Sequence, residues 1–286
     1  MKKIISLLIT LLFLSNTFAT TEVQVYWSQS IVNAQAQLFK KFIDNANKSQ
    51  NKYQFVIVHK PGAGGSIAAN QVLNSNKLAL FGISSTFYVR PYVTKDSHDP
   101  EKFSMMNRLC IDKPMAFYSK KNKIQTGMSV GLAPGVAEIV PILLNKNNPS
   151  LNLLSIPYKT TAEATIAMFG GHTMASIDFY GNASNIMRPD ISILGLTGKR
   201  SINGIPTMHG LENLVIDLFL FAPKNIDPIL YTEFHQIFKD AANDETDSLC
   251  KMDAGIPAKT SLSAMESLHK EYQEKWKQLT NGIKLE

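Results

Sequence analysis

The strongest constraint on the fold is an alternation along the chain. Short apolar runs end in small or hydroxyl-bearing residues and then give way to amphipathic segments. Such runs are typical of buried strands, and apolar residues spaced three and four apart are typical of helices with one buried face. Strands are predicted over 22–26, 53–58, 78–83, 115–119, 128–132, 151–156, 174–178 and 191–196, and helices over 31–46, 66–73, 135–144 and 160–170. This order predicts an α/β fold with a largely parallel sheet.

The C-terminal part adds an apolar run over 214–221 and two helices. Asp227 and Pro228 supply an N-cap and a proline at the first helical position. The apolar face of this helix is expected to consist of Ile229, Leu230, Phe234, Ile237 and Phe238. The last helix carries a core-facing stripe of Leu262, Met265, Leu268, Tyr272, Trp276 and Leu279. Earlier in the chain, Thr160 and Glu163 fit a capping box that starts the helix over 160–170.

The N-terminus has the features of a secretory signal peptide. Lys2 and Lys3 precede an apolar run over 4–14, and small residues follow, so cleavage is predicted near Ala19. The run is too short to span a bilayer, which needs about 20 apolar residues. The mature protein is therefore expected to be soluble and exported. Its two cysteines, Cys110 and Cys250, are permitted to pair in an exported chain, but the sequence does not decide whether they meet.

Composition argues against nucleic acid as a partner. Without Lys2 and Lys3, the 29 Lys and Arg residues fall to 27, against 23 Asp and Glu residues. This balance is only mildly basic, and aromatic residues are not interleaved with clusters of Lys and Arg. The densest basic run, over 120–123, is typical of a solvated turn.

The motifs of several chemistries fail when they are tested against the sequence. The loop HKPGAGGSIAAN over 59–70 lacks the Gly-Lys-Ser/Thr ending of a P-loop. It also has Ile67 where the dinucleotide fingerprint needs its third glycine. Ser66 and Ser84 lack the flanking glycine pair of a Gly-x-Ser-x-Gly nucleophile elbow, and the six histidines show no metal-ligand spacing. Two readings of the loop remain open: an anion site at a helix N-terminus, or a turn without a ligand.

Several predicted strands end in turns of the same kind. These turns are rich in glycine or hydroxyl groups and precede helices, at 28–30, 62–66, 84–86, 131–135 and 158–161. In an open α/β sheet, ligands bind beyond the carboxyl ends of the strands. Several helix N-termini that converge there would suit a carboxylate, because backbone N–H groups and helix dipoles favour an anion.

Four segments resemble the periplasmic solute receptors of tripartite tricarboxylate transporters, also called the Bug family. They are KPGAGGSIAANQV (60–72), IPYKTTAEATIAMFGGHTMASID (156–178), LGLTGKRSINGIPTM (194–208) and FLFAPKNIDPILYTEFHQIF (219–238). With the signal peptide and the last helix, the resemblance covers essentially the whole mature chain. It implies a type II periplasmic binding protein with two α/β lobes, crossing hinge strands and a ligand cleft between the lobes. The first lobe would comprise 20–111 and 218–286, and the second 112–217.

The resemblance also implies partners and site residues. A monomer is expected to bind a small di- or tricarboxylate, or a related acid, for the permease subunits of such a transporter. The family holds its ligands by backbone groups, hydroxyls and bridging water, so no cofactor and no metal are expected. The expected ligand-binding residues are Trp27, Ser28, Gln29, Gly62, Ala63, Gly64, Gly65, Ser66, Ser84, Ser85, Thr86, Ala133, Pro134, Gly135, Tyr158, Lys159, Thr160, Thr161 and Asp178.

The sequence departs from the family at the end of the first strand. A proline-aromatic turn with paired glycines is usual there, whereas this chain has Trp27-Ser28-Gln29-Ser30. The departure predicts that a polar side chain such as Gln29 helps to select the ligand. Two readings of Asp178 stay open: it holds ordered water or a ligand ammonium, or it makes a hydrogen bond within its lobe. Two other functions also stay open, a receptor that feeds a sensor and an enzyme that would use Asp178, Lys159 and Tyr158.

Overall fold

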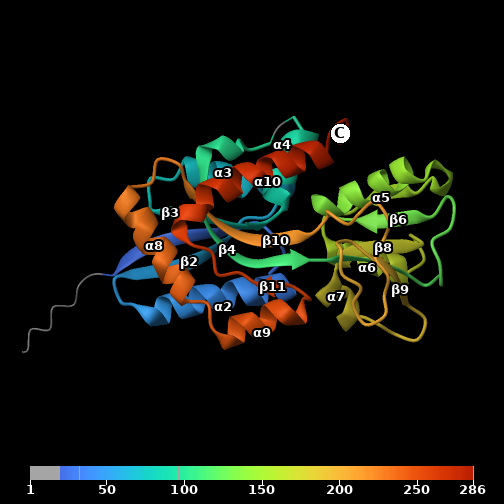
Figure 1. Cartoon of the computed structure of the whole chain (residues 1–286), viewed down its shortest axis with the longest axis horizontal. Helices are drawn as coiled ribbons and strands as arrows, with labels where there is room; N and C mark the ends of the chain where they lie inside the picture. Colours follow the sequence, from blue (N-terminus) through green and yellow to red (C-terminus); the bar gives the residue numbers. More distant parts are fainter. Residues whose placement is uncertain (1–19, 32, 96, 286) are drawn as a thin grey trace, which may run out of the picture.

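The structure consists of two α/β lobes, each with its own sheet, that lie next to each other along the long axis (Figure 1). It is a computed structural model that describes residues 20–31, 33–95 and 97–285. The predicted signal peptide and its cleavage near Ala19 lie outside these residues. Within the described ranges, no helix has both the length and the apolar character needed to span a membrane.

The first lobe is built on a six-stranded sheet in the order β11, β4, β10, β3, β1, β2. Its strands are β1 (Thr21–Trp27), β2 (Tyr53–His59), β3 (Ala79–Ser84), β4 (Phe103–Lys113), β10 (Ile216–Pro223) and β11 (Ile256–Pro257). β1 pairs in parallel with β2 and β3, whereas β10 pairs antiparallel with β3 and β4. In this sheet, the prediction of parallel strands is therefore correct only for β1, β2 and β3.

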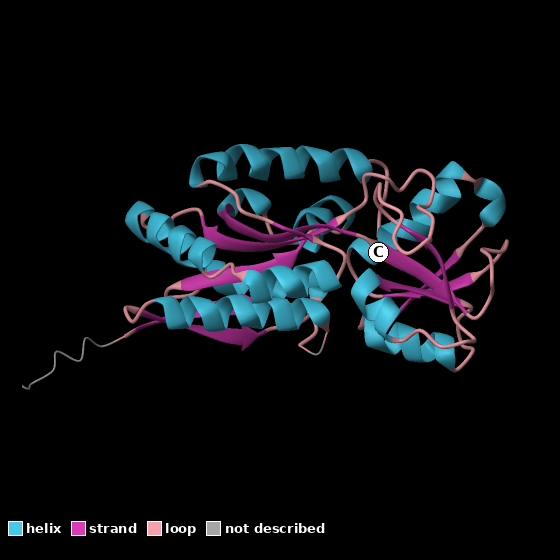
Figure 2. Cartoon of the chain, turned by 60° about the horizontal axis from the view of Figure 1, so that its bottom comes forward, coloured by secondary structure: helices cyan, strands magenta, loops and turns pink. Residues whose placement is uncertain are grey.

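Helices cover both faces of this sheet (Figure 2). They are α2 (Ala34–Ser49), α3 (Ser66–Leu73), α4 (Thr86–Val93), α8 (Pro228–Asp240), α9 (Asp244–Met252) and α10 (Met265–Leu279). Strand β10 contributes to the hydrophobic core on both faces of the sheet, because successive side chains of a strand point to opposite sides. Leu218 and Leu220 pack with α2 and α8, and Phe219 and Phe221 pack with α4 and α10. The C-terminal helices therefore complete the core of the first lobe.

The second lobe has a five-stranded sheet in the order β7, β6, β8, β5, β9. Its strands are β5 (Met115–Ser119), β6 (Ser129–Leu132), β7 (Leu154–Pro157), β8 (Ala175–Phe179) and β9 (Ser192–Leu196). Its helices are α5 (Val136–Asn147), α6 (Thr161–Phe169) and α7 (Tyr180–Asn185). β6 runs parallel to β7 and β8, and β5 runs antiparallel to β8 and β9.

Two chain crossings join the lobes. β4 leads across Pro114 into β5, and the chain returns from β9 to β10 through residues 197–215. The crossings touch each other, since the Met115 backbone N–H donates a hydrogen bond to Oγ1 of Thr197 at 2.8 Å. The predicted architecture, two α/β lobes with crossing hinge strands and a cleft between them, is confirmed.

Several elements differ from the prediction. The first helix begins at Ala34 instead of residue 31, because Asn33 caps it by accepting a hydrogen bond from the N–H of Ala36 at 2.9 Å. The sequence predicts Ile229 on the buried face of its helix, but this residue lies in the first turn of α8 and is 77% exposed. The helix expected after the turn at 84–86 is α4, whereas strands β4 and β11 and helices α7 and α9 are not predicted. Cys110 of β4 and Cys250 of α9 form a disulfide.

Candidate functional site

A cavity of about 630 Å³ lies between the two lobes. The first lobe contributes the turns that follow β1, β2 and β3, and the second contributes those that follow β6, β7 and β8. The residues that line it are Ser28, Gln29, Ser30, Ile31, Asn33, His59, Pro61, Gly62, Ala63, Gly64, Ile83, Ser84, Thr86, Met115, Ala133, Pro134, Val136, Ala137, Lys159, Thr160, Thr161, Glu163 and Phe179. Its volume is in the range of small-molecule sites.

The first-lobe wall of the cavity is a chain of polar side chains. Nε2 of Gln29 donates a hydrogen bond to Oγ of Ser84 at 2.8 Å, and this hydroxyl donates to Oγ1 of Thr86 at 3.2 Å. Oε1 of Gln29 and Oγ of Ser28 are buried and have no hydrogen-bond partner among the described residues. Buried polar atoms are normally paired, so these two are exceptions within the wall.

The glycine loop before α3 lies close against this wall. Gly62, Gly64 and Gly65 have φ values of 123°, 58° and 96°, which residues other than glycine rarely adopt. A Cβ on Gly65 would lie 2.4 Å from Cδ1 of Ile83, so only glycine lets the loop approach β3 this closely. Gly62 and Gly64 line the cavity, and Gly65 lies beneath them.

Ser66 is buried at the start of α3, where its hydroxyl group is hydrogen-bonded to the ring of His98. Nε2 of His98 lies 2.9 Å from the carbonyl oxygen of Phe87, and Nδ1 lies 3.2 Å from Oγ of Ser66. Burial lowers the pKa of His98 to about 4, so the ring is neutral near pH 7. A neutral ring that donates through Nε2 accepts at Nδ1, which orients the hydroxyl of Ser66 toward the ring.

The second-lobe wall is largely apolar in its buried part. Ala133, Val136, Ala137 and Phe179 are all buried, and Met115 from the hinge lies with them. None of these side chains offers a hydrogen bond to a ligand. The polar groups of this wall come instead from residues 159–163.

Both helices that begin at the second-lobe wall already hold a carboxylate at their N-termini. Oε2 of Glu138 accepts a hydrogen bond from the N–H of Gly135 at 2.7 Å. Oε2 of Glu163 accepts from the N–H of Lys159 at 3.1 Å, and Thr160 accepts from the N–H of Glu163. The predicted cap at Thr160 is confirmed, but the Glu163 half of the capping box reaches Lys159 instead of Thr160.

Asp178 lies behind the second-lobe wall and does not line the cavity. Its Oδ1 accepts hydrogen bonds from the N–H of Phe179 at 2.7 Å and from Nδ2 of Asn182 at 3.1 Å. Burial raises its pKa to about 6, because a charged carboxylate is poorly solvated there. Asn182 in turn accepts a hydrogen bond from the N–H of Ala34 in the first lobe at 3.3 Å. These contacts match the reading of Asp178 as a structural residue.

The structure brings most of the sequence-predicted residues to the cavity. Those that line it are Ser28, Gln29, Gly62, Ala63, Gly64, Ser84, Thr86, Ala133, Pro134, Lys159, Thr160 and Thr161. Those that lie outside its lining are Trp27, Gly65, Ser66, Ser85, Gly135, Tyr158 and Asp178. Trp27 is 1% exposed and stacks on Phe39 in the core of the first lobe, with 4.4 Å between the ring centroids.

Sequence reasoning did not find several lining residues. His59, Asn33 and Glu163 flank turns that were singled out, so widening each turn by a few residues would have included them. Met115 and Phe179 belong to strands β5 and β8 and reach the cavity only through the way the lobes meet. No local signal in the sequence marks those two.

The ionisable side chains among the lining residues are exposed. They are His59, Lys159 and Glu163, whereas the lining residues that are buried as a whole have hydroxyl or apolar side chains. Across the described residues, no group of three or more His, Cys, Asp or Glu side chains is placed to hold a metal ion. The arrangement is suited to binding a solute with one polar end.

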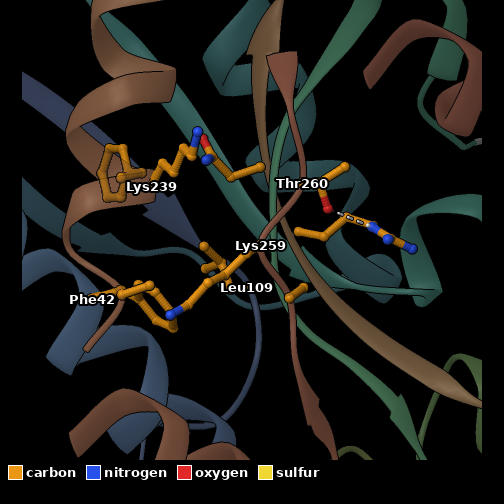
Figure 3. Close-up of a pocket in the computed structure, with 10 residues that line it drawn as sticks. Phe42, Leu109, Lys239, Lys259 and Thr260 are labelled. Carbon is orange, nitrogen blue, oxygen red and sulfur yellow. Dashed lines mark hydrogen bonds between the residues drawn. The ribbon is translucent and has the colours of Figure 1, made fainter. Parts of the chain in front are cut away.

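A second cavity in the first lobe, about 10 Å³ in volume, is too small for a solute (Figure 3). It lies among α2, β4 and α8, and Phe42, Leu109 and Lys239 are among the residues that line it. Nε of Arg108 donates a hydrogen bond to Oγ1 of Thr260 at its edge, at 3.3 Å. A space of this size holds one water molecule at most.

Comparison with known proteins supports the same fold. No family model matches the chain. The UPF0065 protein in gbd 5'region of Cupriavidus necator is 26% identical over an alignment of 240 residues, and the match covers 75% of this chain and 73% of that protein.

Three solved structures superpose on most of the chain. The periplasmic binding protein BugD covers 94% of this chain and 100% of its own, with a TM-score of 0.80 and 18% identity. A Rhodopseudomonas palustris protein with adipate gives 0.81 at 14% identity, with the same coverage. MatC from the same organism, with bound malate, gives 0.75 at 16% identity over 92% of this chain and 99% of its own. The sequence predicts a resemblance to the Bug family, and these comparisons confirm that resemblance in the fold.

Proposed function

We propose that this chain is a periplasmic solute-binding receptor that captures a small organic carboxylate between its lobes. The observation that carries the proposal is the cavity of about 630 Å³, which is lined by strand-end turns of both lobes. Sites at the carboxyl ends of strands bind ligands through backbone N–H groups and short polar side chains. The receptor would pass its ligand to the permease of a tripartite tricarboxylate-type transporter, in line with the resemblance of the sequence to such receptors.

The ligand carboxylate is proposed to face the first lobe. Helices α2, α3 and α4 begin at this wall and have no acidic residue in their first turns. Their N-termini therefore favour an added anion. In the second lobe, Glu138 and Glu163 already occupy the corresponding backbone donors. A second negative charge is less favoured there than at the first-lobe wall.

The remainder of the ligand is proposed to be apolar. Val136, Ala137 and Phe179 face the polar wall across the cavity and are buried. Covering apolar ligand surface with such side chains is favourable by roughly 25 cal/mol per Å². Linear acids such as hexanoate and adipate suit this arrangement better than citrate, which has three charged groups and little apolar surface. The second carboxylate of adipate would lie at the exposed end of the cavity, which Lys159 lines.

Ligand-dependent stabilisation of the mature protein tests this function. At about 100-fold excess over its dissociation constant, a bound acid adds about 2.7 kcal/mol to the free energy of unfolding. We expect adipate or hexanoate to raise the melting temperature and to bind more tightly than citrate in calorimetry. The proposal is wrong if no member of a broad panel of carboxylates and amino acids shifts the melting temperature and native mass spectrometry finds no bound solute.

A variant of Gln29 tests whether the first-lobe wall is where the ligand binds. Gln29→Met keeps the length of the side chain but removes its hydrogen bond to Ser84 and its amide groups. We expect about tenfold weaker binding of the acid, the loss expected for one hydrogen bond. Gln54→Met, at an exposed position of β2, serves as the matched control and should bind as the wild type does. Equal affinities for both variants would place the ligand elsewhere.

A further inference from the structure

An ion pair connects the two lobes beside the cavity. Nη1 of Arg90, on α4 of the first lobe, lies 2.9 Å from Oε2 of Glu138, on α5 of the second lobe. Their side chains are only 13% and 15% exposed. Neither residue lines the cavity, so the pair does not contact a ligand held there. We call Arg90 and Glu138 the interlobe pair.

Each member of the interlobe pair is attached to a turn that does line the cavity. The aliphatic stem of Arg90 covers the glycine loop, because a Cβ on Gly64 would lie 2.5 Å from Cδ of Arg90. The carboxylate of Glu138 accepts a hydrogen bond from the N–H of Gly135, the residue that precedes α5. The pair therefore joins the glycine loop of one wall to the helix N-terminus of the other.

The lobes are also in direct contact at this place. A Cβ on Gly135, in the second lobe, would lie 2.6 Å from Oγ1 of Thr86 in the first. Gly135 has a φ of 125°, so both its backbone and its surroundings exclude a side chain. The Arg90–Glu138 ion pair and the close approach of Gly135 to Thr86 both join the two lobes. They can therefore exist together only while the lobes are closed.

Burial makes the interlobe pair sensitive to the loss of either partner. Desolvation raises the pKa of Glu138, and the Arg90 guanidinium and the N–H of Gly135 oppose this shift. Nε of Arg90 is buried and has no hydrogen-bond partner among the described residues, so Arg90 depends on Glu138 for its charge compensation. Removing one partner leaves the other charge poorly solvated for as long as the lobes stay closed.

We propose that the ion pair between Arg90 and Glu138 forms when the lobes close and sets how long the receptor retains its ligand. This inference rests on the proposed receptor function. In the open state both side chains are free to reach water, so the pair adds to the stability of the closed state only. Closed-state contacts of this kind slow dissociation and leave the encounter of ligand and open receptor nearly unchanged.

Dissociation kinetics of adipate from the full mature chain test the inference. We expect Arg90→Met and Glu138→Gln each to raise the dissociation rate about tenfold and to change the association rate less than twofold. The double variant should dissociate no faster than the more affected single variant, because both changes remove one interaction. Arg188→Met is the matched control, since Arg188 pairs with Asp190 at an exposed site within the second lobe, and it should leave both rates unchanged.

Unchanged dissociation rates in the single variants, or effects that multiply in the double variant, would overturn the inference. A second measurement keeps the test independent of the ligand. In small-angle X-ray scattering without adipate, Glu138→Gln should increase the radius of gyration relative to the wild type, and an unchanged radius would count against the interlobe pair. If adipate fails to bind the wild type but the radius increases, the proposed ligand class is wrong and the role of the pair in closure is supported.

Discussion

At the scale of single residues, the cleft region contains two kinds of buried polar side chain. Some have atoms with no hydrogen-bond partner among the described residues, and others already form hydrogen bonds within the chain. Oγ of Ser28 and Oε1 of Gln29 are buried without partners beside the cavity. Asp178, by contrast, is held by Phe179 and Asn182 and lies behind the wall. Both kinds of residue are polar and follow a strand, so their type and position in the sequence do not distinguish them. Hydrogen bonding in the folded chain does.

The buried carboxyl of Asp178 should make stability depend on pH in one direction. Its folded-state pKa of about 6 lies above the value of 3.8 for the unfolded chain. The folded state therefore binds more protons between these two pH values, and stability falls as pH rises from 3.8 through 6. This difference in pKa corresponds to about 3 kcal/mol. Asp178→Asn should remove the pH-dependent loss because an amide does not titrate, while its oxygen can still accept the hydrogen bond from the N–H of Phe179.

Urea unfolding of the wild type and Asp178→Asn between pH 4 and pH 7 checks this expectation. The difference between their free energies of unfolding should change most between pH 4 and pH 6. Asp190→Asn, at an exposed site of the same lobe, should follow the wild-type curve. Parallel curves for the wild type and Asp178→Asn would contradict the assignment of this pH dependence to Asp178.

At the scale of elements, the disulfide connects parts that the sequence keeps far apart. Cys110 lies on β4 and Cys250 on α9, 140 residues later. Both are buried in the core of the first lobe, and neither lines the cavity. The bridge therefore ties the C-terminal helices to the sheet without taking part in ligand binding.

Loss of the disulfide should lower stability and leave affinity unchanged. A cross-link over so long a loop stabilises a fold by about 5 kcal/mol in the chain-entropy description, mainly by restricting the unfolded chain. The double variant Cys110→Ala/Cys250→Ala should show this decrease in urea unfolding, relative to the wild type under oxidising conditions. Adipate affinity measured at a temperature where both proteins are folded should agree within about twofold. A large loss of affinity would mean that α9 helps to shape the cleft.

At the scale of the whole molecule, a buried charge pair sits where the lobes meet. Lys113, at the end of β4, is fully buried and forms an ion pair with Asp253. Its Nζ also lies 4.9 Å from the ring centroid of Phe179 in the second lobe. Oδ1 of Asp253 accepts a hydrogen bond from the N–H of Gly181, also in the second lobe, at 2.9 Å. The pair thus connects the end of β4 in the first lobe to β8 and α7 in the second.

Breaking this pair should destabilise the whole chain. Lys113→Met leaves the carboxylate of Asp253 buried without its cation, a change that costs about 3 to 5 kcal/mol. Thermal and urea unfolding should show this loss, and the double variant Lys113→Met/Asp253→Asn should recover part of it. Lys77→Met removes an exposed ion pair with Glu22 and should change stability by less than about 1 kcal/mol. Equal effects of the two lysine variants would show that burial does not govern the Lys113 pair.

The sequence by itself determined the class of the fold, most of the strands and the turns from which the cavity is built. These features depend on local physics: the spacing of apolar residues, caps such as Thr160 and Asp227, and glycines that permit unusual backbone angles. Strand β4 and helix α9 are not predicted, because their hydrophobic patterns are irregular and the residues that they pack against are distant in the sequence.

Only the tertiary structure decided which residues of each turn reach the cavity. Trp27 turns into the core next to Ser28, which lines the cleft, because successive side chains of an extended segment point to opposite sides. The pairing of Arg90 with Glu138, the disulfide and the placement of Phe179 and Met115 depend on how the lobes and the C-terminal helices pack. Such contacts join residues far apart along the chain, so no local pattern of the sequence contains them.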